Sequence, residues 1–170
     1  MANRNCLCPV CERHSIPRRC NAFRNTCKPA EKPDYDCALR GIHAQLADEN
    51  DIIISQGENV VFNKIVESHG DLVDYNAGEG VFRLRKEAAY LVNWSVAVEG
   101  CDTKPFVRFA LKVDGRTHSD AAMPITIGML SGSALVMAKK FTSLALTNDT
   151  DDRVRLQAVA PVANITIVSM

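Results

Sequence analysis

Six of the chain's seven cysteines lie within its first 37 residues. These six are Cys6, Cys8, Cys11, Cys20, Cys27 and Cys37, and the seventh is Cys101. Thiols form disulfides, bind metal ions or act as nucleophiles. A chain of 170 residues buries roughly two thirds of its unfolded surface, so it needs no cross-links merely to fold. The crowding therefore indicates a role for these thiols other than completing a small core.

A zinc site and a redox site are two of the roles that such a cluster suggests. Zinc would take Cys6, Cys8, Cys11 and His14 as tetrahedral ligands. The spacing Cys-x-Cys-x-x-Cys, followed by wider gaps, lacks the paired Cys-x-x-Cys knuckles of zinc fingers. A redox pair would be Cys8 and Cys11, but no helix start beside a strand is predicted around them. We therefore favour a third role, which is covalent assembly of chains through disulfides, and we expect no cofactor.

Covalent assembly explains the cysteine count most directly. Seven cysteines cannot all pair within one chain, so at least one thiol stays free or bonds to a neighbouring chain. A disulfide typically stabilises by about 2–4 kcal/mol and makes a reversible contact permanent. All seven cysteines are therefore candidates for intermolecular disulfides. Whether Cys101 receives a cysteine from a neighbour or is a free surface thiol stays open.

Charge and hydropathy exclude several classes of function. The formal net charge of the whole chain is zero, although residues 1–40 hold eight Lys and Arg against four Asp and Glu. This balance argues against a nucleic-acid-binding protein. No apolar run approaches the roughly 20 residues that span a bilayer, and the polar first 20 residues do not resemble a signal peptide. No catalytic constellation stands out, so we expect neither membrane insertion, nor export by a signal peptide, nor enzymatic activity.

The pattern of the chain changes twice. Residues 1–37 are rich in Pro and Cys without apolar periodicity, which predicts an extended arm that has no core of its own. Residues 38–50 place Leu39, Ile42 and Leu46 at helical spacing, so we expect a linker there, with a short helix as one option. Residues 51–170 alternate apolar and polar positions between turn signals, as in "YLVNWSVAV" and "FVRFALKV". They predict an all-β sandwich or barrel.

Residues 60–100 also carry a more specific pattern. Its positions are Phe62, Asn63, Gly70, Tyr75, Asn76, Gly80, Phe82, Tyr90 and Trp94. This pattern resembles the complement component 1 q-type globular head, one of the tumour-necrosis-factor-like jelly rolls. One departure is Ala89, where the family usually has Gly. Residues 131–170 resemble the bacterial branch of the family, found on collagen-like glycoproteins of spore surfaces. The resemblance implies a ten-strand antiparallel jelly roll over residues 51–170 that forms a tight homotrimer.

The cysteine-rich arm and this resemblance together suggest a structural protein. We expect a building block of a bacterial spore surface or extracellular fibre, in which residues 1–37 link one trimer to the next through disulfides. Its partners would be other copies of the chain and other spore-coat proteins. The alternative is a trimeric module that binds a ligand or receptor and is tethered by a disulfide-knotted or zinc-bound arm.

Overall fold

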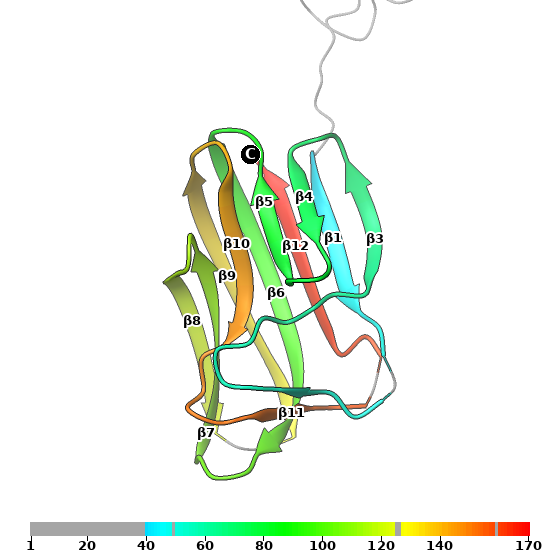
Figure 1. The fold of residues 1–170 in the computed structure, drawn as a ribbon, viewed down its shortest axis with the longest axis vertical. Helices are drawn as coiled ribbons and strands as arrows, with labels where there is room; N and C mark the ends of the chain where they lie inside the picture. The colour runs from blue at the N-terminus through cyan, green and yellow to red at the C-terminus, as the bar shows by residue number, and fades with distance from the viewer. Residues whose placement is uncertain (1–39, 49, 125–126, 159) are drawn as a thin grey trace, which may run out of the picture. The chain divides into compact units, whose positions relative to one another are not determined.

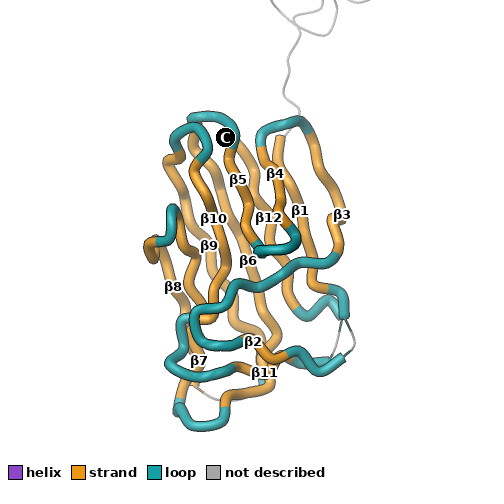
Figure 2. Tube along the Cα trace, in the orientation of Figure 1, coloured by secondary structure: helices purple, strands orange, loops and turns teal. Residues whose placement is uncertain are grey.

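The fold was determined as a computed structural model, which describes residues 40–48, 50–124, 127–158 and 160–170. These residues contain twelve β-strands and no helix (Figures 1 and 2). The strands are β1 (Arg40–Leu46), β2 (Ile53–Ile54), β3 (Lys64–His69), β4 (Val73–Asn76), β5 (Val81–Leu84), β6 (Ala88–Cys101), β7 (Phe106–Val113), β8 (Arg116–Pro124), β9 (Gly128–Ala138), β10 (Thr142–Asn148), β11 (Val154–Leu156) and β12 (Ala163–Ser169). In this part of the chain no helix is long and apolar enough to cross a membrane.

The strands form two antiparallel sheets. A five-stranded sheet has the order β4-β5-β10-β7-β8. A seven-stranded sheet has the order β2-β11-β6-β12-β1-β3, and β9 pairs with the other edge of β6. The all-β antiparallel jelly roll predicted from the sequence is thereby confirmed. The described strands number twelve where ten were predicted: β1 lies before residue 51, and the range from residue 51 includes the short strands β2 and β11, of two and three residues.

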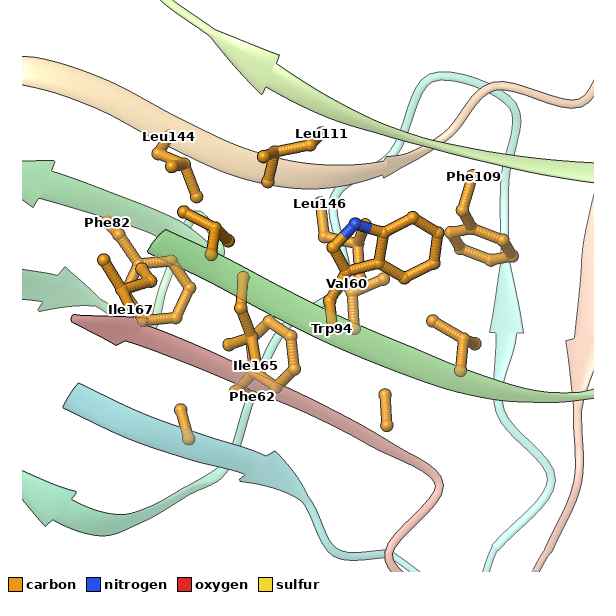
Figure 3. Close-up of a cluster of buried hydrophobic side chains, with 14 of the residues drawn as sticks. Val60, Phe62, Phe82, Trp94, Phe109, Leu111, Leu144, Leu146, Ile165 and Ile167 are labelled. Carbon is orange, nitrogen blue, oxygen red and sulfur yellow. The ribbon is translucent and has the colours of Figure 1, made fainter. Parts of the chain in front are cut away.

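Alternation along each strand determines which residues face the space between the sheets. In β6, Tyr90, Val92 and Trp94 are buried, whereas Leu91 and Asn93 are exposed. The same alternation places Phe82 and Leu84 of β5 inward, as their period of two predicts. Figure 3 shows side chains from both sheets meeting in one core. Burial of these apolar residues is the main force that holds the two sheets together.

The conformation predicted for residues 38–50 is wrong where the structure describes it. Arg40–Leu46 form strand β1, which pairs with β12 on one side and with β3 on the other. The buried side chains are Ile42, Ala44 and Leu46, which follow a period of two. Ile42 and Leu46 fit both a helix and a strand, and the neighbouring strands decide between them. The jelly roll therefore begins by residue 40 and not at residue 51.

Two glycines show how local sequence adapts to this fold. Gly115 follows Asp114 in the two-residue turn between β7 and β8, and both residues have positive φ, at 75° and 48°. Asp-Gly is a preferred pair for such a turn. Gly132 on β9 lies beneath the indole of Trp94, where an added Cβ would come within 2.5 Å of ring atom Cζ2. The Trp94 ring therefore requires a residue without a side chain at position 132.

We predict that Gly132→Ala lowers the free energy of unfolding by about 1–3 kcal/mol, because overpacking forces the ring or strand to move. Gly78→Ala is the control, since its Cβ would meet only Asn76 Oδ1 at 3.4 Å. Urea unfolding followed by tryptophan fluorescence, at one protein concentration, measures both. Equal losses in the two variants would contradict this account of Gly132.

Candidate assembly interface

The outer face of the seven-stranded sheet carries few charges. Around its centre, the outward residues on β9 are Met129, Ser131, Ser133, Leu135 and Met137; those on β6 are Leu91, Asn93 and Ser95; those on β12 are Asn164, Thr166 and Val168, whereas the exposed Glu99 lies near the far end of β6. Charged residues make up 24% of the chain, yet none occurs among these positions. A face of small, apolar and uncharged polar side chains is typical of the centre of a protein–protein interface.

Strand β9 contributes the most protruding apolar residues of this face. Met129, Leu135 and Met137 are 62%, 54% and 75% exposed. Leu135 lies opposite Leu91 in the register between β9 and β6, so the two leucines form a continuous apolar pair. Leu91 is itself 38% exposed. Exposed apolar side chains gathered on one sheet face mark a site of interaction.

A depression lies on the same face, across β12 from these leucines. Its volume is about 370 Å³, and it is lined by residues of β1, β3 and β12. Gly41 is one of its lining residues and lies between Val168 and His69 in register. A Cβ at Gly41 would meet the Ile167 carbonyl oxygen at 2.0 Å. The close approach of β12 therefore excludes a larger residue there.

The titratable groups around this depression come from β1 and β3. His43 lies opposite Glu67 in register, and His69 Nε2 is 3.4 Å from Glu67 Oε1. All three side chains line the depression. Within the described residues, no three His, Cys, Asp or Glu side chains are grouped so that they could hold a metal ion. The face is therefore apolar at β9 and polar at β3.

The residues of the sequence signature have structural roles. Phe62, Tyr75 and Phe82 form an aromatic cluster, with Tyr75 and Phe82 stacked at 4.4 Å between ring centroids. The Tyr75 hydroxyl accepts a hydrogen bond from the Phe62 backbone N–H at 2.6 Å. Tyr90 is fully buried, and its hydroxyl donates to the Lys86 carbonyl at 3.0 Å. These contacts tie the segment before β3 and the turn before β6 to the core.

The polar and glycine positions of the signature fix turns and loop ends. The Asn63 side chain accepts a hydrogen bond from the Ala47 N–H at 2.8 Å, and Asn76 Oδ1 accepts one from Gly78. Gly80 has a φ of 67°, and a Cβ there would lie 2.7 Å from the Val60 carbonyl oxygen. Gly70 lies in the turn after β3 with a φ of 76°. None of these residues belongs to the outer face of the seven-stranded sheet.

Cys101 is the only cysteine in the described part of the chain. It ends β6, is half-buried, and its thiol donates to the Lys104 carbonyl at 3.3 Å. Arg40 and Tyr90 both lie opposite Ser169 in the strand register, so they are at the same end of the sheet. Cys101 follows Tyr90 along β6 by about 36 Å, at 3.3 Å per residue. The thiol therefore lies at the opposite end of the sheet from Arg40.

The other predicted site residues lie outside the described residues. They are Cys6, Cys8, Cys11, His14, Cys20, Cys27 and Cys37. Both the disulfide hypothesis and the zinc alternative depend on them, so both stay predictions. The protruding residues of β9 were not among the predicted site residues, although "SALVMA" was apolar on both faces. The depression at Gly41 depends on strand register, which the sequence does not reveal.

Comparison with known proteins identifies the fold. No family model and no curated protein matches the sequence. Among solved structures, Eiger TNF from S. frugiperda matches 78% of this chain and 92% of its own, with TM-score 0.64 and 13% identity. The match with murine APRIL covers 78% of this chain and 99% of APRIL, with TM-score 0.62 and 12% identity. The match with the globular domain of zebrafish complement 1qA covers 75% of this chain and 94% of that domain, with TM-score 0.57 and 13% identity. The chain thus has the jelly-roll fold of these TNF and complement proteins.

Burial raises the pKa of both Tyr75 and Tyr90 above the ordinary tyrosine value. The folded protein therefore holds these protons more tightly than the unfolded chain. We predict that the free energy of unfolding falls as pH rises above about 10, where the unfolded tyrosines ionise first. Tyr75→Phe should lower stability by about 1 kcal/mol at neutral pH through the lost hydrogen bond, and should also reduce the alkaline decline.

Urea unfolding at about pH 8 and about pH 11 tests this, with both pH values chosen around the tyrosine pKa. Tyr35 lies outside the described residues, and Tyr35→Phe serves as the control for removal of one phenol. The same alkaline decline in the native chain and in Tyr75→Phe would show that Tyr75 does not contribute.

Proposed function

We propose that this protein is a structural building block that forms homotrimers through the outer face of the seven-stranded sheet. Its cysteine-rich N-terminal segment would link trimers covalently, at a bacterial spore surface or in an extracellular fibre. The observation that carries the proposal is the uncharged centre of the outer face of β9, β6 and β12, with three β9 side chains more than half exposed. The role is structural and requires no catalysis.

The two sides of this face are complementary. Apolar side chains protrude at the β9 side, and the depression beside Gly41 lies at the β1 side. Two different patches on one surface favour a head-to-tail contact over a two-fold contact, and head-to-tail contacts close into a ring when the rotation permits. Leu135 of one copy would enter the Gly41 depression of the next. Three such contacts bury the apolar face of every copy.

The cysteines support the second part of the proposal. An odd number of thiols favours at least one link between chains, and Cys101 lies at the end of the sheet away from Arg40. A thiol at that end is suited to receive a cysteine from another trimer. Disulfides persist in oxidising surroundings and are rare inside cells. A protein of a spore surface would therefore cross-link after the mother cell lyses.

We predict that Leu135→Glu dissociates the trimer, because three carboxylates would have to be buried without partners. Sedimentation equilibrium under reducing conditions measures the mass. The expected result is a trimer of about three times 18.7 kDa for the native chain and a folded monomer for the variant.

Phe106→Glu is the matched control for this experiment. Phe106 is 39% exposed but lies on β7 of the five-stranded sheet, so this variant should stay trimeric. Circular dichroism verifies that both variants fold. A native chain that sediments as a monomer under these conditions would refute the trimer.

Covalent linking gives a separate prediction. Gel electrophoresis of air-exposed protein without reductant should show a ladder of bands that reductant collapses to one chain. Replacing Cys6, Cys8 and Cys11 by Ser should remove most of the ladder, and Cys101→Ser tests the receiving thiol. A single species indifferent to reductant would favour the tethered binding module instead. One zinc ion retained per chain would favour the zinc alternative at Cys6, Cys8, Cys11 and His14.

A further inference from the structure

Phe141 ends the turn between β9 and β10 in an unfavourable conformation. Its φ is 67°, yet its side chain is 58% exposed and so is not held there by burial. The Phe141 N–H donates to the Leu84 carbonyl at 2.7 Å, which fixes the turn. Large side chains rarely adopt this left-handed conformation, and glycine adopts it without strain. Because the turn itself would be better served by glycine, the strain points to a use for the ring.

The Phe141 ring borders a broad surface depression of about 830 Å³. Segments from β4, from β5 with the turn after it, and from the β9–β10 turn enclose it, and these lie side by side at one end of the sandwich (Figure 1). Lys140 Nζ lies 4.9 Å from the centroid of the Phe141 ring. Arg83 and Lys86 also line the depression, and neither forms an ion pair with any other described residue.

The acidic side chains of the depression are partly neutralised. Asp74 Oδ2 lies 2.5 Å from Arg85 Nε, so that carboxylate is paired. Asp71 and Glu87 contribute two further carboxylates. Two cations that form no ion pair within the described residues, and several acceptor oxygens, therefore lie around one exposed aromatic ring.

A second, smaller depression continues from the first along β4 and β5. The two share Asp74 and Arg83, and the smaller one, of about 160 Å³, extends to Asn76 and Glu79. Asp74 and Arg83 lie directly opposite each other in the register of β4 and β5. The result is an elongated groove on the five-stranded sheet, with an aromatic ring at one end and hydrogen-bond donors and acceptors along its length.

We propose that this groove binds an oligosaccharide that carries carboxylate groups. A sugar ring presents C–H groups that pack on the exposed face of an aromatic ring. Sugar hydroxyls both donate and accept hydrogen bonds, which matches a lining of carboxylates, an amide and guanidinium groups. A carboxylate on the sugar would pair with Arg83, Lys86 or Lys140. A polyphosphate fits less well, because Asp71 and Glu87 would repel its continuous negative charge.

This groove is separate from the proposed trimer interface. It lies on the five-stranded sheet, whereas the interface is the outer face of the seven-stranded sheet. Neither proposal depends on the other, and their tests can fail independently.

Isothermal titration of the full chain with trigalacturonate tests the proposal. Native protein is expected to bind with a dissociation constant near or below about 1 mM, and Phe141→Gly should weaken binding at least about fivefold. The melting temperature of Phe141→Gly should be equal to or higher than that of the native chain, because glycine relieves the positive φ. If the Phe141 ring merely supported the fold, Phe141→Gly would instead have a lower melting temperature than the native chain.

Phe106→Ala is the matched control. Phe106 is also exposed, and Arg108 Cζ lies 5.5 Å from its ring centroid, but Phe106 lies outside the groove. It should leave binding unchanged. Arg83→Ala should weaken trigalacturonate binding. Absence of trigalacturonate binding at about 10 mM, or equal binding by Phe141→Gly, would overturn the site. If maltotriose bound as tightly as trigalacturonate, the role of the carboxylate would be overturned. If hexaglutamate bound with the same dependence on Phe141, the saccharide assignment would be overturned.

Discussion

Strand β6 is the strand on which the rest of the structure depends. Along its fourteen residues it pairs with β9 on one edge and with β12 and then β11 on the other. Its inward side chains, among them Tyr90, Val92 and Trp94, pack against the five-stranded sheet and bury the apolar surface that stabilises the domain. The same alternation obliges its outward side chains to face away from the core. The composition of the outer face is therefore tied to the strand that organises the inner one.

The two outer faces of the sandwich differ in chemistry. The centre of the seven-stranded sheet, at β9, β6 and β12, presents methionine, leucine and small uncharged residues, whereas β4 and β5 of the five-stranded sheet present arginine and aspartate. Uncharged surface lowers the cost of removing water when two copies associate, and charged surface stays hydrated. One face is thus suited to permanent contact within an assembly and the other to contact with soluble or displayed molecules.

Local alternation predicted the fold well where one pattern dominated. The inward and outward residues of β5, β6 and β12 follow the period of two read from the sequence. Strand β1 was missed because Leu39, Ile42 and Leu46 also fit helical spacing, and only pairing with β12 and β3 decides the matter. The depression at Gly41 and the groove beside Phe141 were not predictable, since each depends on register between strands distant in sequence. The turn "KKF" also contains no glycine or asparagine to announce a positive φ.

The direction of β1, β12 and β6 gives the domain two unlike ends. The last described strand finishes at Ser169 beside Arg40, while the connection from β6 to β7, which contains Asp102 and Thr103, lies at the far end. A passenger peptide fused after Met170 would be displayed at the end where β1 begins. The same peptide inserted between Asp102 and Thr103 would be displayed at the other, near Cys101. The chain therefore offers a vectorial scaffold, on which two cargoes can be carried facing in opposite directions.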